Sequence, residues 1–89
     1  MTLTLYSRPG CHLCVEMEAT IARVALNSPP AFGPLTLEHI DISTDPALEA
    51  QYGLEIPVLL IDGKKAAKFR VSEEELRRIL RGRNEKMGG

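Results

Sequence analysis

Residues 6–14 read Tyr6-Ser7-Arg8-Pro9-Gly10-Cys11-His12-Leu13-Cys14. Residues 2–6, which lead into this stretch and end on its first residue, alternate polar and apolar side chains, which is typical of a short strand. Pro9 and Gly10 then indicate a turn. From Cys11 onward, apolar residues recur at steps of three and four, which predicts a helix with one apolar stripe. The two cysteines therefore lie where a strand gives way to a helix.

The remainder of the chain predicts five more elements. In order, these are a strand over residues 35–42, a short helix opened by Asp45-Pro46, a strand at Val58–Ile61, an edge strand over residues 64–69 and a helix opened by Ser72. Aspartate is a preferred N-cap and proline a preferred first helical residue. The unbroken apolar run at Val58–Ile61 indicates an interior strand covered on both faces.

Together these elements predict an α/β domain with the order β-α-β-α-β-β-α. Asp62-Gly63 is a tight-turn sequence, so the last two strands should be antiparallel. The first two strands are joined through a helix and should be parallel. We therefore expect a mixed four-stranded sheet with helices on both faces. The domain is expected over residues 1–82, followed by a flexible polar C-terminal tail over residues 83–89.

The composition argues against several classes of partner. The chain has 89 residues, a formal net charge of −1, an aromatic content of 4% and no tryptophan. Nucleic acids and anionic membranes need clustered positive charge, and base stacking needs aromatic side chains. The sequence shows neither a secretory signal nor an apolar stretch approaching the ~18 residues of a membrane span. We expect a cytoplasmic monomer without nucleic-acid or membrane partners.

The spacing of the cysteines points to redox chemistry. Cysteines at positions i and i+3 lie on neighbouring helical turns, so their sulfurs can form a disulfide. At the helix start, the free N–H groups and the helix dipole stabilise a thiolate at Cys11, and Arg8 and His12 add positive charge. Thiols in such settings titrate at about 3.5–7.5 rather than ~8.5. Cys11 is the predicted nucleophile, and Cys14, on the apolar stripe, is the predicted resolving thiol.

Other interpretations of the pair remain open at this stage. The thiols could simply pack in the core of an inactive scaffold. A zinc site needs four ligands, and only His12 and His39 remain to complete one, so no metal site is expected within one chain. An iron–sulfur cluster or metal bound through Cys11 of two chains is the alternative function. His39 lies in the middle of a strand, and we expect a structural role for it.

The sequence resembles the glutaredoxin-like family of the thioredoxin superfamily. The resemblance rests on the segment with the cysteines and on Asp41–Asp45, Tyr52-Gly53, Ile56-Pro57-Val58 and Asp62-Gly63. It implies a thioredoxin-like fold, dithiol–disulfide exchange through Cys11 and Cys14, and a cis proline at Pro57 beside them.

The same resemblance implies how substrate binds. The backbone of Ile56, before Pro57, would pair with an extended peptide or thiol substrate. Arg8 occupies the position of a family lysine that helps to hold a thiolate and a substrate carboxylate, and His12 is expected to tune the site. The expected partners are a disulfide-containing protein or small thiol, and a reductase or glutathione for recycling.

Three departures from the family bear on glutathione. Glutaredoxins usually carry Pro-Tyr between the cysteines, Thr-Val before the cis proline and a Gly-Gly kink with an Asp after the last strand. Here the corresponding residues are His12-Leu13, Glu55-Ile56 and Phe69-Arg70-Val71-Ser72. We therefore expect no tightly bound cofactor and only weak binding of glutathione.

Overall fold

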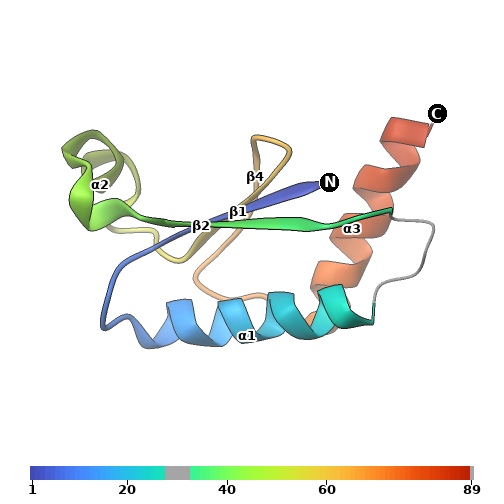
Figure 1. The fold of residues 1–89 in the computed structure, drawn as a ribbon, viewed down its shortest axis with the longest axis horizontal. Helices are drawn as coiled ribbons and strands as arrows, with labels where there is room; N and C mark the ends of the chain where they lie inside the picture. The colour runs from blue at the N-terminus through green and yellow to red at the C-terminus, as the bar shows by residue number, and fades with distance from the viewer. Residues whose placement is uncertain (28–32, 89) are drawn as a thin grey trace.

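The computed structural model describes residues 1–27 and 33–88. Its elements follow the predicted order, with one added 3-10 turn (Figure 1). They are β1 (Thr2–Ser7), α1 (His12–Leu26), β2 (Thr36–Asp41), η2 (Ile42–Thr44), α2 (Pro46–Tyr52), β3 (Val58–Ile61), β4 (Lys64–Lys68) and α3 (Glu73–Gly88). Within the described residues, no helix combines the length and hydropathy needed to cross a membrane.

The sheet has the strand order β2-β1-β3-β4. β1 runs parallel to β2 and antiparallel to β3, and β3 runs antiparallel to β4, which confirms the predicted mixed sheet. All four residues of β3 are buried, as expected for an interior strand. β4 lies at one edge, where Lys64, Lys65 and Lys68 are exposed.

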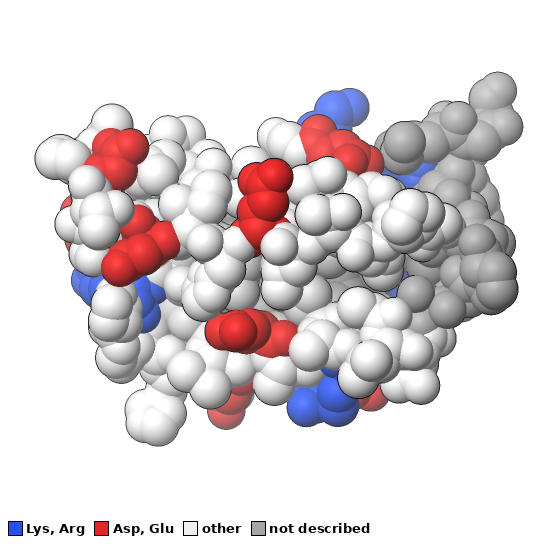
Figure 2. Space-filling model, in the orientation of Figure 1, with Lys and Arg blue, Asp and Glu red and all other residues white. Residues whose placement is uncertain are grey.

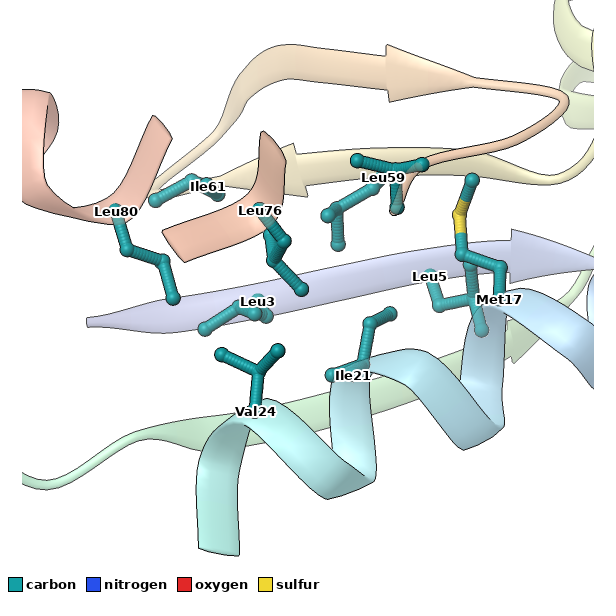
Figure 3. Packing of buried hydrophobic residues seen from close by; sticks show 10 residues of the cluster. Leu3, Leu5, Met17, Ile21, Val24, Leu59, Ile61, Leu76 and Leu80 are labelled. Carbon is teal, nitrogen blue, oxygen red and sulfur yellow. The ribbon is translucent and has the colours of Figure 1, made fainter. Parts of the chain in front are cut away.

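The main core lies on one face of the sheet, beneath α1 and α3 (Figure 3). β1 alternates regularly, so that Leu3 and Leu5 face this core. The apolar stripes of the two helices pack on them, and burying such side chains contributes roughly 1.5–3 kcal/mol each. The helical core residues are Met17, Ile21, Val24, Leu76 and Leu80.

The opposite face carries α2 at one end. Tyr6 points away from the main core and stacks on Tyr52 of α2, with ring centroids 4.6 Å apart and an interplanar angle of 15°. Asp45 caps α2 by accepting the backbone N–H groups of Ala47 and Leu48. Helices therefore lie on both faces of the sheet, as predicted.

The C-terminal boundary differs from the expectation. A tail was expected from residue 83, but α3 continues through Gly82 to Gly88. A single glycine in a helix costs only about 1 kcal/mol relative to alanine. Beyond it, the Arg83 guanidinium donates to the backbone carbonyls of Ile61 in β3, at 3.4 Å, and Lys65 in β4, at 3.3 Å. These contacts tie α3 to the sheet at Arg83.

One further element, the second strand, is shorter than expected. The second strand ends at Asp41 rather than at residue 42, because the Asp41 carboxylate accepts the Ser43 N–H and starts the 3-10 turn. α1 ends at Leu26, with Asn27 as its C-cap. The sequence also predicts that Pro29 and Pro30 help to end the first helix, because proline disfavours its continuation, and these two prolines lie outside the described residues.

The turn between β3 and β4 is also tied to the start of β1. Asp62 and Gly63 have φ angles of 49° and 83°, the left-handed values of a two-residue hairpin. The Asp62 N–H donates to the Thr2 carbonyl at 2.8 Å, and the Asp62 carboxylate accepts the Thr2 N–H at 2.9 Å. One residue thus shapes the hairpin and anchors the central strand.

Two replacements of Asp62 should test its contribution to stability through the hairpin backbone and through the hydrogen bond from Thr2. Asp62→Ala removes the acceptor for Thr2 and places a less suitable residue in the left-handed region, so the free energy of unfolding should fall by about 1–2 kcal/mol. Asp62→Asn keeps an oxygen acceptor and tolerates the same backbone, so it should remain close to wild type. Urea unfolding measures both. A loss in Asp62→Asn equal to that in Asp62→Ala would contradict this account.

Candidate active site

The candidate site begins where β1 ends. The chain turns through Arg8, Pro9 and Gly10, and the φ angle of Gly10 is 81°, a value that side-chain-bearing residues rarely adopt. The Cys11 N–H donates to the Arg8 carbonyl at 3.3 Å and closes the turn. This geometry delivers Cys11 to the N-cap position of α1, as predicted.

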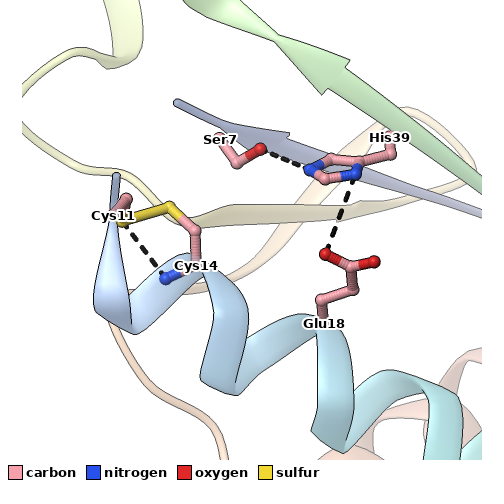
Figure 4. Close-up of a disulfide and its surroundings, with 5 residues drawn as sticks. All are labelled: Ser7, Cys11, Cys14, Glu18 and His39. Carbon is pink, nitrogen blue, oxygen red and sulfur yellow. Dashed lines mark hydrogen bonds and ion pairs between the residues drawn. A yellow bond between two sulfur atoms is a disulfide. The ribbon is translucent and has the colours of Figure 1, made fainter. Parts of the chain in front are cut away.

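Cys11 caps the helix with its sulfur. The backbone N–H of Cys14 donates to Cys11 Sγ at 3.1 Å (Figure 4). The two cysteines are joined as a disulfide, with Cα atoms 5.2 Å apart. Cys11 is half-buried, whereas Cys14 is only 4% exposed. In the reduced pair, the same N–H and the helix N-terminus would stabilise a thiolate on Cys11.

A cleft of about 280 Å³ opens beside the disulfide. Cys14 and Glu18 line it from α1, while Ser7, His39 and Asp41 line it from β1 and β2. Of the predicted site residues, Arg8, Cys11 and Cys14 line this cleft; His12, Ile56 and Pro57 do not.

Ser7, His39 and Glu18 form a connected row in this cleft. Ser7 is 5% exposed, and its hydroxyl is hydrogen-bonded to His39 Nε2. On the other side of the ring, His39 Nδ1 lies 3.8 Å from Glu18 Oε2 (Figure 4). These residues lie far apart in the sequence, and their connection was not predicted from it. The only available signal was the four-residue step from Cys14 to Glu18, which puts both on one helical face.

Two carboxylates, Glu18 and Asp41, and one guanidinium, Arg8, line the cleft. Hydrogen bonds from the Ser43 hydroxyl and N–H hold the pKa of Asp41 below its usual range, with smaller contributions from His39 and Arg8. Asp41 is therefore ionised at neutral pH. Figure 2 shows acidic side chains spread over the face that has β2 in front and α1 below it.

Arg8 lies between the cleft and α2. Its guanidinium forms an ion pair with the Glu49 carboxylate, and its Nη2 lies 3.3 Å from where a Cβ on Gly53 would sit. Both side chains of the ion pair are partly exposed. His12 is exposed at the start of α1.

The segment before β3 lies at the same end of the sheet. Tyr6 pairs with Val58, so the turn after β1 and the residues before Val58 are neighbours in the fold. The bond between Ile56 and Pro57 is cis, in agreement with the family resemblance. Pro57 is buried and Ile56 half-buried.

Glu55, before this proline, is paired with two lysines of β4. Its carboxylate lies 2.8 Å from Lys65 Nζ and 3.6 Å from Lys68 Nζ. The hydrogen bond from Lys65 is the main reason that the pKa of Glu55 lies below its usual value. The negative charge that the sequence places beside the proline is therefore offset by its neighbours.

The segment after β4 keeps a bend without glycine. Phe69 has a φ angle of 67°, and its N–H donates to the Pro57 carbonyl at 2.9 Å. A residue with this φ is uncommon unless it is glycine. The backbone therefore turns where the resemblance would place a Gly-Gly kink, but a phenylalanine side chain occupies the position.

Comparison with known proteins agrees with this geometry. The family model described as Glutaredoxin-like domain (DUF836) matches residues 2–81. The chain belongs to this glutaredoxin-like family. An uncharacterized protein of Mycobacterium tuberculosis is 33% identical to this glutaredoxin-like chain over 76 residues, which cover 82% of the chain and 75% of that protein.

Two solved structures extend the comparison. The X-ray structure of XcR50 from X. campestris is 31% identical, with a TM-score of 0.73 over 90% of this chain and 96% of that one. Thioredoxin 1 from Thermosipho africanus TCF52B is 21% identical, with a TM-score of 0.67 over 100% of both chains. The similarity to thioredoxin 1 shows a shared thioredoxin-like fold, as expected from the sequence.

Among the described residues, no three histidine, cysteine or acidic side chains group closely enough to hold a metal ion. A cluster shared through Cys11 of two chains stays an alternative prediction. Visible absorbance of anaerobically purified glutaredoxin-like protein would reveal such a cluster.

The difference in exposure between the cysteines predicts their order of alkylation. In the reduced protein, limiting iodoacetamide near neutral pH should label Cys11 first, because Cys14 is buried and Cys11 lies at the helix N-terminus. Peptide mass spectrometry identifies the labelled residue. Denatured protein, in which both thiols are accessible, serves as the control. Preferential labelling of Cys14 in the folded protein would reverse the assigned roles.

Proposed function

We propose that this protein is a thiol–disulfide oxidoreductase that uses Cys11 and Cys14. The observation that carries the proposal is the asymmetry of the pair. Cys11 is an accessible N-cap whose sulfur accepts a backbone N–H, whereas Cys14 is buried three residues later on the same helix. One thiol is thus suited to attack a substrate and the other to remain protected until the first has reacted.

The reaction proceeds in two exchanges. The Cys11 thiolate attacks one sulfur of a substrate disulfide, forms a mixed disulfide and releases the other substrate sulfur as a thiolate, which takes up a proton. The Cys14 thiolate then attacks Cys11 Sγ, closes the Cys11–Cys14 disulfide and releases the second substrate thiol. Two electrons pass from the dithiol to the substrate, and an external thiol reductant returns them.

The substrate is proposed to be a disulfide on a protein or a small thiol. Val15, which is 65% exposed, lines the cleft next to the cysteines. The backbone around Ile56 is proposed to pair with an extended substrate segment, and Arg8 and His12 to support binding at the thiolate. A reductase or glutathione is proposed to recycle the pair in the cytoplasm.

Substitution of each cysteine tests the two-step scheme. Cys11→Ser should abolish reduction of a small mixed disulfide, because the nucleophile is lost. Cys14→Ser should still attack but should accumulate a mixed disulfide that intact-mass spectrometry can detect. Wild-type protein without exchange activity would contradict the proposed function. Full turnover by Cys14→Ser would instead mean a route that needs only Cys11.

Reduced glutathione is expected to bind weakly. Residues 69–72 lack the Gly-Gly kink and the aspartate with which glutaredoxins are expected to hold glutathione. Each lost charge-assisted hydrogen bond costs about 1.5–3 kcal/mol, or roughly one to two decades in affinity. Calorimetric titration of the reduced protein should give a dissociation constant of about 1 mM or weaker. S-methylglutathione, which cannot exchange, is the control ligand. Low-micromolar binding would contradict this expectation and would mean that other residues, such as Arg8, bind glutathione.

A further inference from the structure

We infer that Ser7 and His39 form a proton relay that serves the thiol of Cys14. The inference rests on the proposed function, because it concerns the second exchange step. It assigns a role to Ser7 and His39, which lie outside the Cys11–Cys14 pair and the segment around Pro57. His39 acts through Ser7 and is therefore a positioning residue.

The fold brings the three residues together from distant parts of the sequence. Parallel pairing of β1 with β2 sets Leu5 opposite His39 and Ser7 opposite Asp41. Paired residues share a face, so Ser7 and His39 lie as diagonal neighbours on the face covered by α1. Cys14 reaches the same cleft from α1. In Figure 4, Ser7 lies between the disulfide and the His39 ring.

The surroundings of Cys14 create the need for a proton acceptor. Burial disfavours the charged form of a thiol, and Cys14 is 4% exposed. The carboxylates of Glu18 from α1 and Asp41 from β2 line the same cleft, and like charges also disfavour a thiolate. The nearby cation, Arg8 from the turn after β1, is paired with Glu49 of α2. A thiolate would therefore form with difficulty at Cys14 unless a nearby group accepted the thiol proton.

Histidine is the side chain suited to that task at neutral pH. With Glu18 facing Nδ1, the ring proton belongs on Nδ1, and Nε2 accepts the Ser7 hydroxyl proton. The Ser7 oxygen keeps lone pairs that can accept the S–H of Cys14 once the disulfide with Cys11 has opened. The Glu18 carboxylate favours the positive charge that His39 acquires.

The proton balance of the second step follows. The Cys14 thiol gives its proton to the Ser7 oxygen as the Ser7 hydroxyl proton passes to His39 Nε2. The Cys14 thiolate forms the bond to Cys11 Sγ, and the bond between Cys11 and the substrate sulfur breaks. The departing substrate thiolate takes up a proton, and His39 returns to its neutral form by giving its proton up.

The first experiment measures ionisation of Cys14 alone. In Cys11→Ser, the ultraviolet absorbance of the thiolate reports the titration of the remaining thiol. Adding His39→Gln keeps a hydrogen-bonding partner for Ser7 but removes the proton acceptor, and adding Ser7→Ala removes the bridge. Each should shift the titration upward by about one pH unit or more, equivalent to at least tenfold.

The matched control is Cys11→Ser with Glu38→Gln. Glu38 is exposed on β2 next to His39, and strand alternation places it on the other face of the sheet. This control should titrate like Cys11→Ser alone. The relay is overturned if the titrations of the His39→Gln and Ser7→Ala proteins coincide with that of the control.

The second experiment measures the rate at which Cys14 resolves a preformed mixed disulfide on Cys11. His39→Gln should slow this step about tenfold near neutral pH. The loss should shrink once the pH rises above the titration midpoint that the first experiment gives for the His39→Gln protein, because Cys14 then ionises without an acceptor. A loss of the same factor at every pH would indicate a structural role and overturn the relay. Absence of exchange in the wild type would instead contradict the proposed function, because the thiolate titration does not depend on activity.

Discussion

The pairing of β1 with both of its neighbours is the constraint on which the rest of the structure depends. Its parallel register with β2 places His39 and Asp41 beside Ser7, and its antiparallel register with β3 brings the segment before Val58 to the end of β1 where the cysteines follow. The alternation of β1 assigns Leu3, Leu5 and Ser7 to the face beneath α1. A shift of one residue would turn these side chains to the other face.

The site derives its chemistry from two different environments only three residues apart. The sulfur of Cys11 meets a backbone N–H at the helix start, where negative charge is favoured. The sulfur of Cys14 is buried in the interior. There a negative charge on the sulfur is disfavoured unless a neighbouring group accepts the thiol proton. One helix therefore supplies both a ready nucleophile and a protected one.

Much of this arrangement could be predicted from the sequence, because its determinants are local. The cap at Asp45, the turn at Asp62-Gly63 and the start of α3, where the Ser72 hydroxyl accepts the Glu75 N–H, each depend on residues within a few positions. The contacts of His39 with Ser7 and Glu18 could not be predicted, since they require the register of two strands and the placement of a helix upon them. The extension of α3 was missed for the same reason: Arg83 contacts carbonyls about twenty residues away in the sequence.

The position of α3 in the chain has a consequence for biosynthesis. Leu76 and Leu80 are fully buried and complete the core over β1 and β3. They are also translated after every strand of the sheet. While the chain emerges from the ribosome at ~5–20 residues per second, Leu3, Leu5 and Ile61 lack α3, one of the two helices that cover their face of the sheet. The part of the sheet that α3 covers thus stays exposed until α3 has been made, and a ribosome that stalls before α3 would leave an apolar surface for chaperones to bind.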